Sequence, residues 1–357
     1  MNKTKLLLTL LTFILTMGCI LPAAATPTPD LFATLQASTP SNFSPPRVTQ
    51  SVAPPVFNLS TVTPTSISSS AQTPIPPPSS SDQPSGHIVF TCQVFRTQAA
   101  EQICIMNADG SGFRRLTTED GIRHFYPSLD PNGQSVLYSA YLADNNYEVY
   151  QLEFEDGSLG RLTNIYGADT APEVSPDGQF ITFTHDSPTK NTQQIVVADR
   201  NGGNAGNIPR INGWDPTWSP DGKQILFASD RDGAVQLFTI RTDGSSLHRI
   251  TNLPAIRGRS DWSPDGQYIV TYSGEAWHRE LYIMNADGSN VRQITPSGGN
   301  SQGPSFSPDG RWVVFTAYFD NYNDNNGCEI YIIRIDGTDL RRLTNNDTCD
   351  YQPRWGP

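Results

Sequence analysis

A turn sequence recurs at an almost constant interval through the C-terminal part of the chain. It reads Asp-Pro-Asn-Gly at 130–133 and Ser-Pro-Asp-Gly at 175–178, 219–222, 263–266 and 307–310, so the closing glycines lie 45, 44, 44 and 44 residues apart. Proline presets the first turn position and glycine accepts a positive φ, so each motif predicts a hairpin turn between two strands. The interval therefore predicts a fold made of equivalent, repeated units.

A second turn recurs in the other half of each unit, at an Asp-Gly or Asn-Gly pair. These pairs lie at 109–110, 156–157, 201–202, 243–244, 287–288 and 336–337. Strand-like runs flank them, such as 281–284 before one pair and 291–294 after it. Each unit then contains four short strands and two tight turns, which is the composition of one β-propeller blade.

The two ends of the repeat region complement each other. The chain stops at 351–357, an inner strand cut off within its turn, while the folded region begins at 86–91 with a second strand that lacks its predecessor. We therefore predict an all-β, six-bladed β-propeller that is closed when the C-terminal inner strand pairs with the N-terminal strands. Six residues at one inner-strand position should pack between neighbouring blades: Leu129, Val174, Trp218, Trp262, Phe306 and Trp355.

Residues 1–25 have the features of an export signal. Lys3 and Lys5 precede an apolar stretch at 6–17, which is shorter than the roughly 20 residues that span a bilayer. The segment 15–19 resembles a lipobox and predicts lipidation at Cys19. The alternative is cleavage after Ala25, at an Ala-Ala-Ala site, which would give a secreted or periplasmic protein. Lipidation at Cys19 and cleavage after Ala25 both predict a protein that works outside the cytoplasm.

Residues 26–85 differ in composition from the rest of the chain. Of these 60 residues, 35 are Pro, Ser or Thr and only three are charged. Such a segment buries too little apolar surface to offset the entropy of ordering it, so we predict a disordered linker ahead of a propeller at 86–357. The net charge of −11 excludes a general binder of nucleic acid or of an anionic membrane surface.

Four cysteines lie in the repeat region, at 92, 104, 328 and 349. An even number in an exported protein favours disulfides, and four cysteines allow three connectivities. Cys92 and Cys104 fall on hairpin neighbours, and Cys328 and Cys349 fall near loops on one face. We predict the bonds Cys92–Cys104 and Cys328–Cys349, which would lock the joint between the two ends of the chain. The absence of a C-x-x-C pair argues against zinc.

The repeats resemble those of a known family. The Ser-Pro-Asp-Gly turns, the strand and turn at 281–288 and endings such as Arg342-Leu343-Thr344 are similar to the WD-like β-propeller repeat of the TolB-like family. The resemblance covers 86–357 and implies a protein-binding platform. The family's namesake has an additional N-terminal α/β domain and is a soluble periplasmic partner of a peptidoglycan-associated lipoprotein. Here the linker takes the place of that domain.

Candidate ligand-binding residues cluster on the face where the inner strands begin, around the mouth of the predicted central channel. Mixed charge with an exposed aromatic residue suits a polar ligand or a peptide end. We therefore predict a monomeric, surface-tethered and non-catalytic binding protein for a protein or cell-envelope ligand, without a cofactor. The candidate residues are Arg123, His124, Asp169, Trp214, Asp215, Arg257, Arg259, Gln302, Asp350 and Gln352.

Some residues also suggest three other kinds of site: a metal-dependent catalytic site, a serine hydrolase elbow and a calcium site. A metal-dependent polysaccharide lyase or hydrolase, with its site at the central channel, is the alternative function; His124, His185 and His278 would be its candidate ligands. The run 299–303 matches G-x-S-x-G, but it precedes a strand and no histidine follows it, so a hydrolase elbow is not predicted. The oxygen-rich run 320–327 departs from the EF-hand pattern and suggests at most a loose calcium site.

Overall fold

The structure, a computed structural model, describes residues 83–357 except 95–99, 120, 144–145, 191, 210, 257 and 318–326. The predicted signal segment, Cys19, Arg257 and most of the predicted linker lie outside the described residues. So does the oxygen-rich run, apart from Gly327. Among the residues described, no helix has the length and apolar character needed to cross a membrane.

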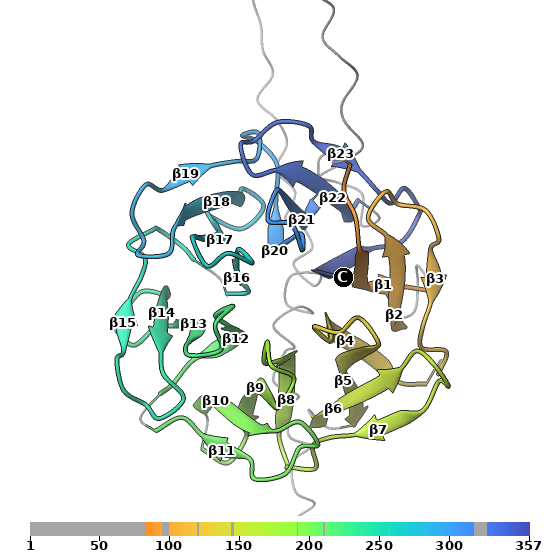
Figure 1. The fold of residues 1–357 in the computed structure, drawn as a ribbon, viewed down its shortest axis with the longest axis vertical. Coiled ribbons are helices and arrows are strands. Elements are labelled where there is room, and N and C mark those ends of the chain that lie inside the picture. Colours follow the sequence, from red (N-terminus) through yellow and green to blue (C-terminus); the bar gives the residue numbers. More distant parts are fainter. Residues whose placement is uncertain are drawn as a thin grey trace, which may run out of the picture. The chain divides into compact units, whose positions relative to one another are not determined.

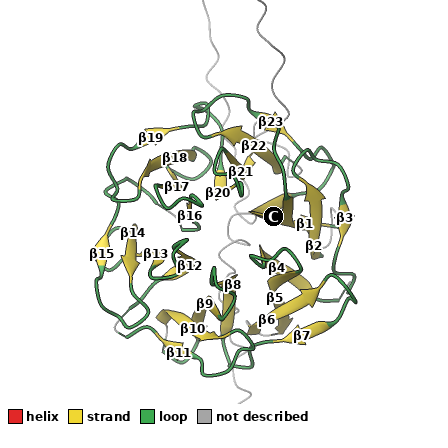
Figure 2. Cartoon of the chain, viewed as in Figure 1, coloured by secondary structure: helices red, strands yellow, loops and turns green. Residues whose placement is uncertain are grey.

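Strands and loops make up the described part of the chain (Figure 2). The strands form four four-stranded sheets and one eight-stranded sheet. The first sheet, here called the closing unit, has the order β24 (Asp350–Gly356), β1 (His87–Gln93), β2 (Glu101–Asn107) and β3 (Arg114–Arg115). Figure 1 shows the sheets arranged around a common centre, which confirms the predicted all-β propeller.

The eight-stranded sheet contains two antiparallel meanders, here called the second and third units. The second unit comprises β4 (Arg123–Leu129), β5 (Ser135–Ala143), β6 (Asn146–Glu153) and β7 (Leu159–Arg161). The third comprises β8 (Ala168–Val174), β9 (Phe180–Ser187), β10 (Thr192–Asp199) and β11 (Gly206–Asn207). A single parallel bridge, Tyr147 to Ala168, joins them.

Three further four-stranded meanders follow. The fourth unit comprises β12 (Trp214–Trp218), β13 (Ile225–Ser229), β14 (Gln236–Ile240) and β15 (His248–Arg249). The fifth comprises β16 (Asp261–Trp262), β17 (Tyr268–Ser273), β18 (Glu280–Asn285) and β19 (Arg292–Gln293). The sixth comprises β20 (Gln302–Phe306), β21 (Trp312–Ala317), β22 (Glu329–Arg334) and β23 (Arg341–Arg342).

The two ends of the described chain meet in the closing unit. Strand β24 pairs antiparallel with β1, with Trp355 opposite Ile88 and Gly356 opposite His87 (Figure 1). The Trp355 indole donates a hydrogen bond to the Ser85 carbonyl at 2.8 Å. Strand β24 therefore supplies the inner strand of a sheet whose other strands come from residues more than 230 positions earlier.

The apolar core is divided among the interfaces between consecutive units. Trp355, for example, packs with Ile88 of the closing unit and with Trp312 of the sixth unit. The other clusters repeat this arrangement, so that all six residues predicted to pack between neighbouring units do so. Since burial of apolar area is the main favourable term in folding, each unit depends on its neighbours for stability.

The recurrent Leu-Thr or Ile-Thr ending of the outer strands has a hydrogen-bonding role. The Thr163 hydroxyl accepts from the Val149 amide at 2.9 Å and donates to Glu148 at 2.7 Å. Arg161 also binds Glu148, through an ion pair at 2.8 Å. Arg161, on the outermost strand of its unit, therefore neutralises a buried carboxylate.

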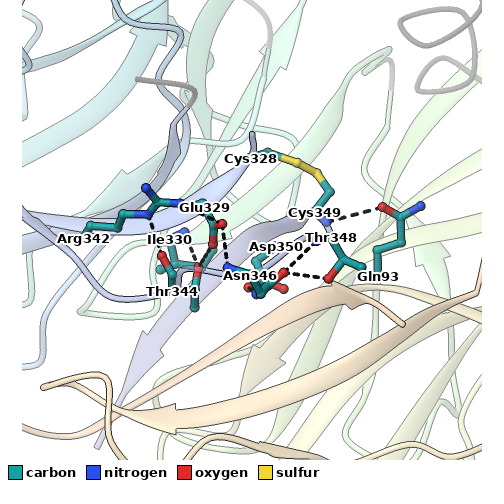
Figure 3. Close-up of a disulfide and its surroundings, with 10 residues drawn as sticks. All are labelled: Gln93, Cys328, Glu329, Ile330, Arg342, Thr344, Asn346, Thr348, Cys349 and Asp350. Carbon is teal, nitrogen blue, oxygen red and sulfur yellow. Dashed lines mark hydrogen bonds and ion pairs between the residues drawn. A yellow bond between two sulfur atoms is a disulfide. The ribbon is translucent and has the colours of Figure 1, made fainter. Parts of the chain in front are cut away.

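The two disulfides have the predicted connectivity. Cys92–Cys104 links β1 to β2 within the closing unit, whereas Cys328–Cys349 links the start of β22 to the start of β24 (Figure 3). The Asp350 amide beside the second bond donates to the Cys328 carbonyl at 2.9 Å. This bond therefore joins the sixth unit to the closing unit. Disulfides persist in oxidising compartments, so both bonds fit a protein outside the cytoplasm.

Candidate functional site

The inner strands carry an unusual backbone conformation at one repeated position. Tyr126, Ala171, Asp215, Gly303 and Gln352 occupy this position in five units, with φ values of 54°, 52°, 53°, 59° and 56°. A proline follows each of them, and the strand pairing shifts register there, as in a β-bulge. Four of the five are not glycine, and a left-handed conformation costs such residues roughly 1–2 kcal/mol each. Strain of this kind concentrates at functional sites.

The fifth unit departs from this pattern. Arg259 occupies the equivalent position, Ser260 replaces the proline, and the positive φ of 146° falls on Gly258 instead. A Cβ at Gly258 would collide with the Asp215 carboxylate, which accepts a hydrogen bond from the Arg259 amide at 2.9 Å. The glycine therefore lets two neighbouring units approach closely at this point.

Two layers of side chains result from the repeat register. The mouth layer consists of the six residues, one from each unit, at the repeated position just described. The inner layer consists of the six residues that lie two positions further along the inner strands. The mouth layer comprises Tyr126, Ala171, Asp215, Arg259, Gly303 and Gln352. The inner layer comprises Ser128, Glu173, Thr217, Asp261, Ser305 and Arg354.

Contacts in the mouth layer cross between units. The Gln352 side-chain oxygen accepts from the Thr91 hydroxyl and from the Tyr126 amide, each at 2.9 Å. Arg259 donates through Nη2 to the Pro127 carbonyl at 2.8 Å, and its guanidinium lies 5.5 Å from the Tyr126 ring centroid. Strands β16 and β4 lie on opposite sides of the centre (Figure 1), so Arg259 reaches across the ring.

Arg354 makes the corresponding cross-links in the inner layer. Its guanidinium donates to the Pro304 carbonyl at 3.2 Å and to the Ser260 carbonyl at 3.4 Å, and it lies 3.8 Å from the Asp261 carboxylate. Asp261 also accepts from the Ser305 hydroxyl at 2.8 Å. Three units are therefore connected through one buried arginine.

Burial shifts the proton affinities of these groups. It raises the pKa of Glu173 to about 7; nearby Asp261 adds to this rise and Arg354 opposes it. Burial also lowers the pKa of Arg259 to about 9, and the positive charge of Arg354 adds to this shift. The pKa of Asp215 is raised by burial. Charge in the two layers is therefore held by mutual compensation between neighbouring groups.

Three of the predicted ligand-binding residues, Asp215, Arg259 and Gln352, come together in the mouth layer. Sequence reasoning missed Tyr126 in that layer and the charged residues Glu173, Asp261 and Arg354 in the inner layer. An alignment of the five tetrapeptide turns with the chain's C-terminus would have placed these residues in register.

The predicted residues on β4 and β8 are engaged in internal contacts. His124 is 1% exposed, and its Nδ1 lies 3.2 Å from the Gln102 side-chain oxygen. Burial lowers the pKa of His124 to about 4, so the ring is neutral at pH 7. Arg123 pairs with Glu101 at 2.6 Å. Asp169 is fully buried and lies 2.7 Å from Nδ1 of His185.

The remaining predicted residues lie apart from the mouth layer. Trp214 packs against the cluster between the fourth and fifth units. Gln302 accepts from Arg279 at 2.8 Å. Asp350 accepts from Asn346 at 2.7 Å, and burial raises its pKa to about 7, with Glu329 also raising it (Figure 3).

The three histidines considered as metal ligands come from different units. His124 lies on β4, His185 on β9, and His278 just before β18. Within the described ranges, no group of three or more His, Cys, Asp or Glu side chains is arranged to hold a metal ion.

The fold and the two inner-strand layers define a β-propeller with a charged, cross-linked centre. The chain belongs to the TolB beta propeller domain family, whose profile matches residues 88–317. A Tol-Pal system protein TolB from Francisella tularensis is 25% identical over 175 residues, which are 35% of this chain and 40% of that protein. An uncharacterized peptidase YuxL from Bacillus subtilis is 32% identical over 94 residues, 24% of this chain and 14% of that protein.

The chain thus spans less than half the length of these two relatives. Among solved structures, TolB from Acinetobacter baumannii superposes with a TM-score of 0.67 at 23% identity, covering 76% of this chain and 67% of that one. A likeness at this level of identity establishes the shared fold.

Stability is expected to fall as the pH rises from about 5 to 7. Glu173 and Asp350 have folded pKa values of about 7, above the roughly 4 of an unfolded carboxyl, so the folded state binds more protons in this window. Each group should lower the free energy of unfolding by up to about 1.4 kcal/mol per pH unit. Urea titrations at pH 5, 6, 7 and 8 measure this slope.

The Glu173→Gln variant should show a shallower slope than the unsubstituted protein. Glu155→Gln is the matched control, because Glu155 is exposed in a turn and its loss should leave the slope unchanged. Equal slopes in all three proteins would mean that Glu173 is ionised throughout the range.

Proposed function

We propose that this chain is a non-catalytic, surface-tethered binding protein that presents the mouth-layer face of a six-bladed propeller to a protein ligand of the cell envelope. Lipidation at Cys19 would provide the tether, and residues 26–85 would hold the propeller away from the membrane. The proposal places the protein outside the cytoplasm, as a monomer without a cofactor.

The count of six closed blades rests on three features. The eight-stranded sheet divides into two meanders that share one bridge, so it counts as two blades. Strand β24 pairs with β1 and supplies the missing inner strand. One apolar cluster lies between each pair of consecutive units, including the sixth and the closing unit. Each feature supports a ring in which every blade has two neighbours.

The observation that carries the proposed function is the strained mouth layer. Four non-glycine residues there keep a left-handed φ that glycine, which occupies the same position in the sixth unit, adopts without strain. On loops of the same face, Tyr166 is 68% exposed and Trp277 is 40% exposed. Exposed aromatic residues around a polar centre are typical of protein-binding surfaces. The relative named for the Tol-Pal system supports a protein as the ligand.

Site-specific photo-crosslinking in the native envelope tests this proposal. A photoreactive phenylalanine analogue at Tyr166 reports on the mouth-layer face, and the same analogue at Leu247, which is 41% exposed in the turn before β15, reports on the opposite face. We expect a discrete protein adduct from position 166 and background from position 247. Adducts from position 247 alone, or turnover of an envelope polysaccharide by the purified protein, would contradict the proposal.

A further inference from the structure

Two nearly buried side chains in the mouth layer have hydrogen-bond donors without acceptors. Arg259 is 5% exposed and Gln352 is 6% exposed. Among the described residues, none accepts a hydrogen bond from Nε or Nη1 of Arg259 or from Nε2 of Gln352. Their other polar atoms are engaged, as Nη2 of Arg259 contacts Pro127 and Oε1 of Gln352 contacts Thr91. Both side chains are therefore held in place while part of each stays unsatisfied.

One position of the mouth layer carries no side chain. Gly303 occupies the mouth layer in the sixth unit, between Arg259 of the fifth unit and Gln352 of the closing unit. A Cβ built on Gly303 would meet no atom within 4 Å. The mouth layer therefore has room at the Cβ position of Gly303, in the unit between the units of Arg259 and Gln352.

The chemistry of the donors selects the ligand. A buried donor without an acceptor is destabilising, and a ligand that supplies the acceptor would remove this cost. The planar guanidinium presents Nε and Nη as a fork that matches the two oxygens of a carboxylate. We propose that Arg259 and Gln352 bind a carboxylate carried by a peptide chain, such as its C-terminal end. The peptide source rests on the proposed function, which assigns a protein ligand to this face.

The surrounding charges link this binding to proton uptake. Arg259 faces Asp215, Glu173 and Arg354, while Glu173 faces Arg354, Asp261, Arg259 and the Thr217 hydroxyl. A bound carboxylate partly neutralises the positive charge of Arg259 and adds negative charge near Glu173. Protonation of Glu173 then becomes more favourable, so the carboxylate should bind more tightly at pH 6 than at pH 8.

Titration of the full-length protein with acetyl-triglycine tests the site. Calorimetry gives the affinity, and the NMR chemical shift of ¹⁵Nε of Arg259 reports whether the guanidinium binds the ligand. We expect the free acid to bind and to shift this resonance, and the C-terminal amide to bind at least about tenfold more weakly, since a charge-assisted hydrogen bond contributes about 1.5–3 kcal/mol. Equal binding of acid and amide, or no shift of the Arg259 resonance, would overturn the proposal.

Gln352→Glu is the decisive variant. The new carboxylate keeps the acceptor that Thr91 and Tyr126 use, but it replaces the unsatisfied NH₂ group with an oxygen and repels an anion. Gln293→Glu is the matched control, because it makes the same substitution at an exposed position of the outer strand β19, away from the mouth layer. We expect loss of acid binding in the first variant and retention in the second, with circular dichroism unchanged in both. Retained binding in Gln352→Glu would overturn the site.

The outcomes separate this inference from the proposed function. Crosslinking from position 166 that persists in Gln352→Glu, together with no binding of the free acid, would reject the carboxylate site and leave the protein ligand in place. Galacturonate, used as a second probe, distinguishes a carboxylate on a sugar from a carboxylate on a peptide. Binding of galacturonate without binding of acetyl-triglycine would overturn the peptide assignment.

Discussion

Removing the indole of Trp355 is expected to lower the free energy of unfolding by about 3–5 kcal/mol, the usual cost of truncating a large buried aromatic residue to alanine. Trp355 is 8% exposed and packs between Ile88 of the closing unit and Trp312 of the sixth. Its indole also bonds the Ser85 carbonyl. Urea unfolding of Trp355→Ala at constant pH measures the loss. Trp277→Ala is the control, because that ring is 40% exposed and should cost much less.

A deletion of 351–357 extends the same test to the whole strand. It removes nearly all of β24 and leaves β1 with an unpaired edge on its inner side. We expect loss of a single cooperative transition and rapid proteolysis from the N-terminal side of the closing unit, because each unit depends on both neighbours. Unchanged melting and protease resistance after this deletion would show that the ends of the chain do not hold the propeller together.

Features that repeat in the sequence could be predicted from it. The turn glycines, the apolar residues between units and the pairing of 351–357 with the N-terminal strands all follow from the interval of the turns, because equivalent positions must have equivalent surroundings. The disulfide between Cys328 and Cys349 followed from the same register, which puts both cysteines at strand starts on one face.

Features that depend on a departure from the repeat were harder to predict. His124 has the position of a mouth-face residue, but it turns into the core toward Gln102, a contact that depends on the neighbouring unit. Arg259 crosses the ring in the unit where Ser260 replaces the proline and Gly258 takes the positive φ. A single chain read along its length does not show which residues face one another across a centre, so the inner layer around Arg354 was missed.

Replacing Arg354 with methionine is expected to cost about 3–5 kcal/mol of folding free energy, because Arg354 is buried and its loss leaves the neighbouring, largely buried carboxylates without their counter-charge. Methionine preserves most of the side-chain volume, so the loss reports on charge and hydrogen bonding more than on packing. The Pro304 and Ser260 carbonyls lose their donor, and Asp261 loses its ion pair with Arg354. Arg311→Met is the control, since Arg311 pairs with Asp309 at the surface, where an ion pair contributes about 0–1 kcal/mol.

The pH dependence of the stability of Arg354→Met distinguishes the loss of a compensating charge from the loss of packing at the centre of the propeller. Arg354 is the first of the charges that lower the pKa of Glu173, so its removal should raise that pKa above about 7 and extend the loss of stability to higher pH. The double variant Arg354→Met with Asp261→Asn should recover part of the stability, because it removes a carboxylate that Arg354 had compensated. If the double variant is as unstable as the sum of its parts, Arg354 and Asp261 act independently, and the inner layer is not a charge network.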